Sequence, residues 1–383
     1  MKNPFIETAA GTGNDYLNEW KQSGGKVVGY TCSYLPDEIF CSAGIVPYRL
    51  RGTGTEKTTI GDTYFGPFIC SLPKCMLQLA GEGKFNFLDG LIITPGCDSM
   101  RRLDECWRKA GEDIEGTLPD FFFHFGVPHK HAGYTVKWFE EEIRRLISET
   151  ENHFSLKIDG DKLKDSVKLY NRSRELLEEF DKLRTADEPP FTGGDALSVI
   201  LAGTAMPRDI YNSLLEKFIS DAKKSEGIKD KVRLMLVGSA NDDVDFVKVI
   251  EGDKALVVAD NLCFGSRFYT DYVKEDGDPV YNLADSYLAR NDCPRMYGQY
   301  KHRLETIKKK VNESKVDGVI LQNIRFCDLH GSENGIFERD LEAAGIPAMR
   351  LEREYGPLVE TGRIRMRVDA FIERILQAGG RTV

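Results

Sequence analysis

This sequence of 383 residues lacks several features that mark large classes of proteins. It contains no apolar run of about 20 residues, which a membrane-spanning helix needs, and its segment 1–20 has no apolar signal core. It also lacks an excess of basic residues, since the formal net charge is −9, whereas nucleic-acid-binding surfaces are basic. We therefore expect a cytoplasmic protein that binds neither a membrane nor a nucleic acid.

Nucleotide-binding motifs are also missing. Residues 52–59 (GTGTEKTT) resemble a phosphate-binding loop in composition, but no Gly-x4-Gly-Lys-Ser/Thr motif occurs in the sequence. Residues 234–243 (LMLVGSANDD) contain one glycine where a dinucleotide-binding fingerprint has three. Any use of ATP is therefore expected to depend on a partner protein.

Strand and helix patterns alternate in two parts of the chain. The first part contains predicted strands at 26–31, 45–50, 89–96 and 120–127, and the second at 232–239, 254–261, 317–326 and 346–354. Residues 135–225 show helical periodicity only. Such alternation is typical of parallel sheets covered by helices on both faces. We predict an α/β protein with two doubly wound parallel-sheet (flavodoxin- or Rossmann-like) domains at 1–134 and 231–383, joined by a helical segment at 135–230.

Four of the nine cysteines lie just beyond the carboxyl ends of predicted strands, two in each half. They are Cys32, Cys97, Cys263 and Cys327. A free cysteine is often a small core residue, and in a reducing cytoplasm we expect no disulfides. However, ligands bind beyond the carboxyl ends of strands in open parallel sheets. If the two halves face each other, these thiols converge on one cleft.

Cysteines also lie where helices are expected to begin. Cys97, and similarly Cys70, stands near a predicted helix N-terminus, where free N–H groups and the positive end of the helix dipole stabilise a thiolate. Asp98 and Asp328 are suitable capping residues after their cysteines. Thiolates without a neighbouring histidine favour an iron–sulfur group over zinc. Because no Cys-x-x-Cys pair occurs, spacing alone does not define a cluster.

Two other chemistries remain open at this point. Cys327 and His330 could form a thiolate–imidazole pair for nucleophilic catalysis. His124, His129 and His131 could bind zinc, although Pro128 and the absence of a carboxylate at helical spacing favour a simple loop.

Arg49 and Arg51 follow the second predicted strand. They could bind an anionic substrate, but the simpler interpretation, a solvated pair of charges, is the one we expect.

Several segments together resemble the benzoyl-CoA reductase / 2-hydroxyacyl-CoA dehydratase family, and most of all its smaller iron–sulfur subunit. The most specific are GCDSMRRLDECW (96–107), VVADNLCFGSRFY (257–269), DGVILQNIRFCD (317–328) and a Gly-x4-Arg-x2-Ala-Phe-x-Glu pattern at 362–373. The similarity runs in order from about residue 25 to residue 377.

The resemblance implies a [4Fe–4S] cluster between two α/β domains, bound by three cysteines and with one iron open to water, sulfur or substrate. The matching positions are Cys70, Cys97 and Cys327. One branch of the family binds an 8Fe–9S double cubane through six cysteines. Positions similar to this second set are Cys32, Cys263 and Cys293. The remaining cysteines, Cys41, Cys75 and Cys106, match no ligand position, although Cys75 is close enough to Cys70 in sequence to be an alternative.

The resemblance also implies a function. Enzymes of this kind add one electron at very low potential to an acyl-CoA thioester, either an aromatic acyl-CoA or a 2-hydroxyacyl-CoA, under anaerobic conditions. The electron comes from a separate ATP-hydrolysing iron–sulfur activator, which agrees with the missing P-loop. The chain is then expected to pair with a homologous subunit or a second copy of itself. Ser33 and Glu38 are candidate catalytic residues, because the family uses this N-terminal region for substrate.

Three alternatives stay open. The chain could be a double-cubane homodimer that reduces small molecules. It could be an electron-transfer subunit whose partner binds the substrate. It could also be a metal-free binding protein in which the cysteines fill the core.

Overall fold

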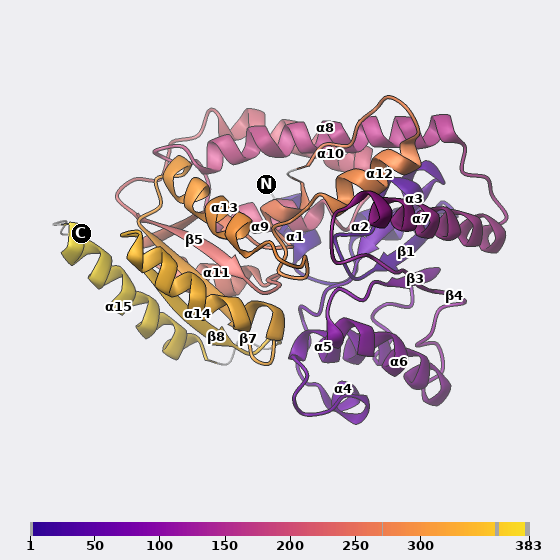
Figure 1. Cartoon of the computed structure of the whole chain (residues 1–383), viewed down its shortest axis with the longest axis horizontal. Coiled ribbons are helices and arrows are strands. Elements are labelled where there is room, and N and C mark those ends of the chain that lie inside the picture. Colours follow the sequence, from indigo (N-terminus) through magenta and orange to yellow (C-terminus); the bar gives the residue numbers. More distant parts are fainter. Residues whose placement is uncertain (1–2, 270, 357–359, 380–383) are drawn as a thin grey trace.

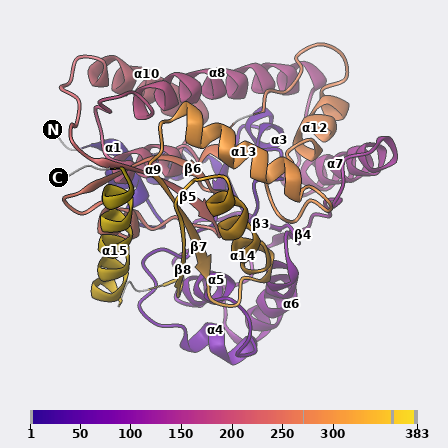
Figure 2. The same ribbon diagram turned by 60° about the vertical axis from the view of Figure 1, so that its left-hand side comes forward.

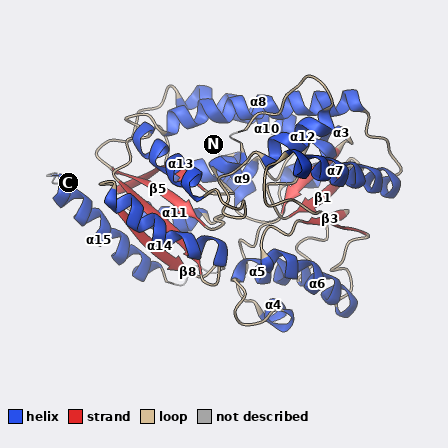
Figure 3. Cartoon of the chain, in the orientation of Figure 1, coloured by secondary structure: helices blue, strands red, loops and turns tan. Residues whose placement is uncertain are grey.

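The computed structural model describes residues 3–269, 271–356 and 360–379, and it contains two separate four-stranded parallel sheets (Figures 1 and 3). The strands of the first sheet are β1 (Lys26–Tyr30), β2 (Ile45–Arg49), β3 (Gly90–Ile93) and β4 (Phe121–His124). The strands of the second are β5 (Val232–Gly238), β6 (Ala255–Asn261), β7 (Gly318–Ile324) and β8 (Ala348–Arg353). The predicted α/β class with two doubly wound sheets is confirmed.

Both sheets have the same strand order, β2-β1-β3-β4 in the first and β6-β5-β7-β8 in the second. In each, the chain starts at an inner strand, adds one edge strand, and then crosses back to build the other side. Connections therefore leave β1 and β3, and likewise β5 and β7, in opposite directions. Such a switch point is where open α/β sheets bind ligands. Cys32 and Cys97 follow the first pair, and Ser239 and Cys327 follow the second.

The N-terminal half contains six helices among its described residues. They are α1 (Pro4–Ala9), α2 (Asp15–Gln22), α3 (Glu38–Ser42), α4 (Thr59–Tyr64), α5 (Ser71–Gly81) and α6 (Asp98–Asp113). Helix α6 is amphipathic, since its buried residues Met100, Leu103, Trp107 and Ala110 recur every three or four positions. This face packs in the same apolar cluster as the buried residues of α5. Together α5 and α6 carry two of the predicted ligands.

The middle of the chain is helical, as predicted. Its helices are α7 (Gly133–Phe154), α8 (Gly160–Arg184), α9 (Gly193–Ala202) and α10 (Arg208–Ala222). The helical periodicity of 194–224 spans two helices, separated by residues 203–207. Gly203 ends α9 and Pro207 precedes α10. Helix α8 lies along the top of both halves in Figures 1 and 2 and packs against α3 and α10.

The C-terminal half contains the remaining described helices. They are α11 (Val244–Glu251), the 3₁₀ turn η1 (Ser266–Phe268), α12 (Pro279–Leu288), α13 (Tyr300–Glu313), α14 (Asp328–Ala343) and α15 (Thr361–Gly379). Helix α12 packs against α7, whereas α9 packs against α1 and α11. Helices thus pack across the predicted boundaries at 134 and 230, and that division stays a prediction. Within the described ranges, no helix is both long and apolar enough to cross a membrane.

Polar contacts join the two halves at the carboxyl ends of their sheets. Arg290 Nη1 donates to the carbonyl of Ser33 at 3.0 Å, in the loop after β1. The N–H of Gly52 donates to the hydroxyl of Tyr355 at 2.8 Å, in the segment after β8. The loops that carry the predicted cysteines therefore face one another across this junction.

Candidate functional site

Three cysteines occupy the same structural position, the N-cap of a helix. Cys70 precedes α5, Cys97 precedes α6 and Cys327 precedes α14. None of the thiols accepts a full capping hydrogen bond, but first-turn N–H groups near each thiol oppose the rise of its pKa. The prediction that Asp98 and Asp328 are the caps is wrong, because each is the first residue inside its helix, where a carboxylate still interacts with the dipole.

These three N-cap cysteines, the N-cap set, are neighbours in space. Cys70 is 5% exposed, and Cys97 and Cys327 pack against the same apolar cluster. Burial raises the pKa of Cys70 above its usual value, and Cys327 and Cys97 raise it further. Burial likewise raises the pKa of Cys97 to about 12. Without a positive charge or a metal, these thiols are protonated.

The other three predicted ligands, the loop set, lie outside helices. Cys32 follows β1, Cys263 follows β6 and Cys293 follows α12. Cys263 and Cys293 line one small cavity together with Ser33, and Cys32 and Cys293 pack against one apolar cluster. Burial raises the pKa of Cys32, Arg295 opposes this rise and Cys293 adds to it. Cys32 and Cys293 are therefore close to each other and to a guanidinium group.

The two sets adjoin each other. A methyl group placed on Gly96, the residue before Cys97, would lie 3.4 Å from Cys32 Sγ. Burial raises the pKa of Cys327, and Cys293 and Cys263 raise it further. The structure thus brings together all six cysteines that the sequence singled out, from both halves of the chain. Their role as ligands stays a prediction.

The remaining cysteines lie elsewhere, and all nine are free. Cys75 Sγ lies 3.8 Å from the carbonyl oxygen of Tyr355, and Cys106 Sγ lies 3.4 Å from that of Tyr64. Cys41 is in α3. Burial raises the pKa of its thiol, and a hydrogen bond with Ser166 opposes this rise.

The donor chemistry of the six thiols suits a cluster of several irons. In the described part of the chain, no three His, Cys, Asp or Glu side chains are grouped to hold one metal ion. Thiolates that bind a multi-iron cluster are instead spread over its corners, and they come without histidine in all-cysteine clusters. The six cysteines, spread over a common junction of buried loops, fit such a group.

The three histidines of residues 124–131 do not share a site. Nδ1 of His124 lies 3.3 Å from Asp104 Oδ2, whereas Nδ1 of His129 lies 3.0 Å from the carbonyl of Arg295. His131 Nε2 lies 2.9 Å from Asp285 Oδ1. Each imidazole thus has a different partner, as in the loop that we expected.

His330 reaches Cys327 through its backbone. The His330 N–H opposes the rise of the Cys327 pKa, and burial together with Arg267 and Arg303 lowers the pKa of the His330 ring well below its usual value. The ring is therefore neutral. This arrangement gives no support to a thiolate–imidazolium pair.

The prediction of a solvated Arg49–Arg51 pair is wrong, because both side chains are buried, at 2% and 1% exposure. Arg51 Nη1 donates to the carbonyl of Ala9 at 2.8 Å and so anchors the end of α1. Arg49 is the last residue of β2. Its Nη1 donates to the carbonyl of Cys263, and its guanidinium lies 3.7 Å from the ring centre of Phe264. Sequence alone suggested solvation because arginine is rarely buried.

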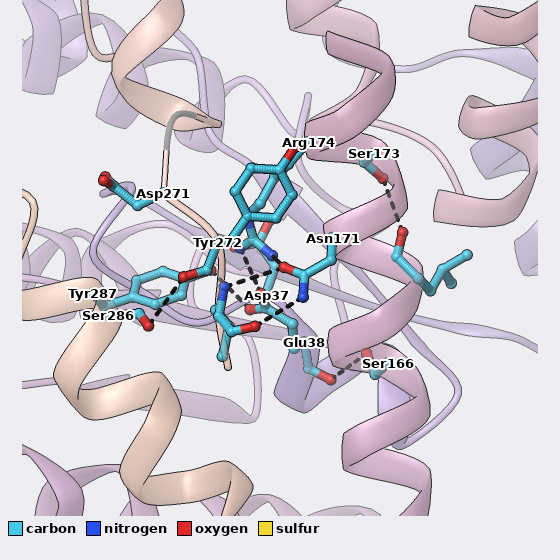
Figure 4. A network of polar contacts seen from close by, with 12 residues as sticks. Asp37, Glu38, Ser166, Asn171, Ser173, Arg174, Asp271, Tyr272, Ser286 and Tyr287 are labelled. Atoms are coloured by element: carbon cyan, nitrogen blue, oxygen red, sulfur yellow. Dashed lines mark hydrogen bonds and ion pairs between the residues drawn. The ribbon is translucent and has the colours of Figure 1, made fainter. Parts of the chain in front are cut away.

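Glu38 is buried in a network that links three helices (Figure 4). Its carboxylate accepts from Arg174 Nη2 of α8 at 2.7 Å and from the hydroxyl of Tyr287 of α12 at 2.8 Å. Burial alone would raise the pKa of Glu38, but Arg174, together with hydrogen bonds from Tyr287 and the backbone, outweighs burial, and the pKa lies below its usual value. These contacts hold α3 against its neighbours. Ser33 is also buried, beside Cys263 and Cys293. Catalytic roles for Glu38 and Ser33 stay predictions.

An exposed aromatic pair flanks the N-cap set and was missed from the sequence. Phe68 is 77% exposed and Phe326 40% exposed, and their rings meet edge to face at 5.7 Å. Each stands within two residues of a predicted ligand, Cys70 or Cys327. Phe326 also has a φ of 64°, the left-handed region that a bulky residue rarely adopts. Its backbone is strained directly before the N-cap of α14.

With this site described, the comparisons with known proteins place the chain in a class. The family model of the 2-hydroxyglutaryl-CoA dehydratase D-component matches residues 32–375, and the chain belongs to this family of acyl-CoA dehydratase and reductase subunits.

Its relatives are subunits of dehydratases and of a reductase. The chain is 26% identical to the (R)-phenyllactyl-CoA dehydratase beta subunit of Clostridium sporogenes over 361 residues, 94% of each chain. It is 26% identical to one of the subunits of the benzoyl-CoA reductase of Thauera aromatica over 321 residues, 81% of each chain. It is 25% identical to the (R)-2-hydroxyglutaryl-CoA dehydratase beta subunit of Acidaminococcus fermentans over 342 residues, 88% of this chain and 89% of the relative. The resemblance inferred from the sequence is confirmed.

Proposed function

We propose that this chain is the iron–sulfur subunit of a low-potential enzyme that acts on an acyl-CoA thioester, as a reductase or a 2-hydroxyacyl-CoA dehydratase. Cys70, Cys97 and Cys327 would hold a [4Fe–4S] cluster at the junction of the two halves. The observation that carries this proposal is the meeting of three N-cap thiols from α5, α6 and α14 in one apolar cluster.

The bound cluster would supply one-electron transfer at a potential that no side chain reaches. The chain itself supplies the surroundings. The three helix N-termini favour the thiolate form of the ligands through their free N–H groups and dipoles. The apolar cluster around Cys70 excludes water, and buried Ser33 stands beside the junction, where it could position a substrate.

Electrons at so low a potential would need an energy source, and the sequence has no P-loop with which this chain could itself bind ATP. We propose a separate ATP-hydrolysing iron–sulfur activator as the partner that supplies these electrons. The relatives are themselves named as single subunits of larger enzymes, which supports a complex with a homologous subunit or with a second copy of this chain.

The first experiment measures iron and acid-labile sulfide in protein purified without oxygen. We expect about four irons per chain if only the N-cap set is occupied, and about eight if both sets are. A colourless protein without iron would contradict the proposal and leave a binding protein with core cysteines as the better interpretation. Purification with and without co-expressed homologous subunits shows whether iron binding needs a partner.

A second candidate is favoured by one observation, the loop set that adjoins the N-cap set. Six thiols would hold an 8Fe–9S double cubane, and a homodimer of the chain would reduce small molecules. The two candidates differ in substrate. With the activator and ATP, the first candidate should either be reoxidised by an aromatic acyl-CoA or convert a 2-hydroxyacyl-CoA to the enoyl-CoA without net oxidation, whereas the second should be reoxidised by small electron-accepting molecules. If none of these reactions occurs unless a partner subunit is added, the chain is an electron-transfer subunit.

A further inference from the structure

Three arginines around the loop set are buried without a carboxylate. Arg49, Arg267 and Arg295 are 2%, 6% and 3% exposed. Among the described residues, no carboxylate oxygen lies within 4.0 Å of their guanidinium nitrogens. The Nε–H group of each is buried and has no hydrogen-bond acceptor. Burying a cation without an anion is costly, so each of these positions calls for an explanation.

Other buried arginines of the chain show the usual arrangement. Arg174 pairs with Glu38 at 2.7 Å, and Arg184 pairs with Asp260 at 2.6 Å. Both members of each pair are at most 5% exposed. In the described part of the chain, buried arginines without a carboxylate also occur away from the loop set, at Arg51 and Arg353, but only around the loop set do three of them contact segments that carry cysteines.

Each of the three arginines contacts the segments that carry the loop cysteines. Arg49 Nη1 donates to the carbonyl of Cys263. Arg267 lines the cavity beside Cys263 and Cys293, and its Nη1 donates at 3.2 Å to the carbonyl of Asp292. Arg295 lies two residues after Cys293, and its guanidinium lies 4.6 Å from the ring centre of Tyr34, two residues after Cys32.

The hydrogen bonds of these arginines fix the loops but go to neutral groups. Asp271 and Asp292 line the same cavity as Arg267, and Asp37 interacts with Arg49, so carboxylates offset only part of the positive charge. Arg295 donates to the carbonyls of Pro128 and Val127, both at 2.9 Å, and Arg267 Nη2 donates to that of Gly238 at 2.9 Å. Carbonyl groups satisfy N–H donors but carry no net charge. The three thiols therefore lie in a buried place with an excess of nearby positive charge. Thiolates that hold an iron–sulfur group carry, together with that group, a net negative charge that would balance it.

We infer that Arg49, Arg267 and Arg295 form a cationic cage that compensates the negative charge of an iron–sulfur group on the loop set and makes that group easier to reduce. This inference rests on the second candidate of the proposed function, in which the loop set also holds iron and sulfur. A cationic surround stabilises the reduced, more negative state, so loss of one positive charge lowers the reduction potential. Within the described ranges, the capping turns of the N-cap set carry no buried arginine, and that set depends on helix N-termini instead.

The test compares Arg295→Gln with Arg295→Lys, because both lose the guanidinium fork but only the lysine retains the charge. Arg49→Gln and Arg49→Lys form a second pair in case the first does not fold. Arg51 provides the matched control, since it is equally buried, binds carbonyl groups at α1 and lies two residues from Arg49.

Two quantities are measured on protein purified without oxygen, namely the reduction potential by EPR-monitored titration and the melting temperature before and after removal of iron by a chelator. We expect Arg295→Gln to have a more negative potential than Arg295→Lys. With iron bound the lysine variant should melt higher than the glutamine variant, and without iron the order should reverse. For the control, Arg51→Gln and Arg51→Lys should keep the same order of melting temperatures with and without iron. Neither should change the reduction potential.

The cationic cage is overturned if the Gln and Lys variants have equal reduction potentials and keep the same order of melting temperatures with and without iron, at both Arg295 and Arg49, in protein that still binds iron. The proposed function would then still stand. Wild-type protein without iron would overturn the proposed function itself.

Discussion

The two cysteine sets hold their thiols in different ways. The N-cap set uses three helix N-termini and an apolar cluster. The loop set uses irregular segments fixed by buried arginines, and it adjoins the acidic pair Asp37 and Glu38 of the segment after Cys32. A thiolate can be stabilised in a buried place by backbone dipoles or by full charges. Dipoles need no counter-charge of their own, whereas buried charges must be balanced, so the two sets should respond differently to substitution.

The largest effect is expected from Glu38→Gln, which breaks the buried ion pair that holds α3, the helix after Cys32, against α8. The change leaves Arg174 buried without its carboxylate, and removing one partner of a buried ion pair typically costs about 3–5 kcal/mol. The midpoint of urea unfolding should fall accordingly. Because the pKa of Glu38 is below its usual value, its stabilising contribution is present above its unfolded pKa and is lost as the pH falls.

The control for this prediction is the double variant Glu38→Gln with Arg174→Met. It removes both charges, so most of the lost stability should return. A single variant as stable as the wild type would show that the Glu38–Arg174 pair does not stabilise the packing of α3 on α8.

The second prediction concerns the pH dependence that Asp37 introduces. Burial raises the pKa of this carboxyl to about 6, although Arg208 opposes the rise and the Tyr30 hydroxyl donates to it at 2.8 Å. A raised folded pKa means that this contribution to stability is fully present below the unfolded pKa of about 3.8 and is lost as the pH rises through about 6.

Asp37→Asn should therefore stabilise the chain at pH 7, by up to about 3 kcal/mol. The difference between the variant and the wild type should disappear at pH 4. Denaturant unfolding at both pH values measures it. If the difference in unfolding free energy between variant and wild type is the same at pH 4 and pH 7, Asp37 does not titrate in this range.

A smaller effect separates the cysteine sets directly. Serine is a good N-cap residue, so Cys97→Ser should stabilise the iron-free chain by about 1 kcal/mol through a hydrogen bond to the first turn of α6. Cys263→Ser has no helix to cap and should give no gain. Thermal unfolding after chelation measures both. Equal changes at the two positions would remove the distinction between the sets.

An effect of similar size is expected at Phe326, whose left-handed backbone precedes the N-cap of α14. Phe326→Gly and Phe326→Ala both remove the ring, but only glycine adopts a φ of 64° without strain. The glycine variant should be the more stable by about 1 kcal/mol. The corresponding pair at Phe68, which has no positive φ, should show no such preference. An alanine variant as stable as the glycine variant would show that the strain is absent.

Local patterns were enough to predict the strands and four of the six cysteines, whereas Cys70 was indicated only weakly by its helix start and Cys293 came only from the family resemblance. An apolar run that ends in a cysteine marks both the strand and the residue beyond it, as at Cys97 and Cys327, and strand ends of one sheet necessarily share an edge. The break at 203–207 had a local signal too, since Gly203 and Pro207 punctuate the helical pattern. Helix α14 was harder to predict because Gly331 and Gly335 weaken its periodicity.

The electrostatics of the site could not be predicted in the same way. Arg267 and Arg295 lie within four residues of Cys263 or Cys293, so their position was visible in the sequence. Their burial was not, because arginine is usually exposed and only the packing of both halves covers these side chains. Likewise, the partners of Glu38 come from α8 and α12, more than a hundred residues away. Long-range pairing of this kind leaves no local pattern.

The most direct test is the iron and acid-labile sulfide content of two matched triple variants, Cys32/Cys263/Cys293→Ser and Cys70/Cys97/Cys327→Ser, beside the wild type. If both sets form one site with two parts, the wild type should hold about eight irons, the loop-set variant about half of that, and the N-cap variant no intact cluster. An iron content that neither triple substitution changes would contradict the account.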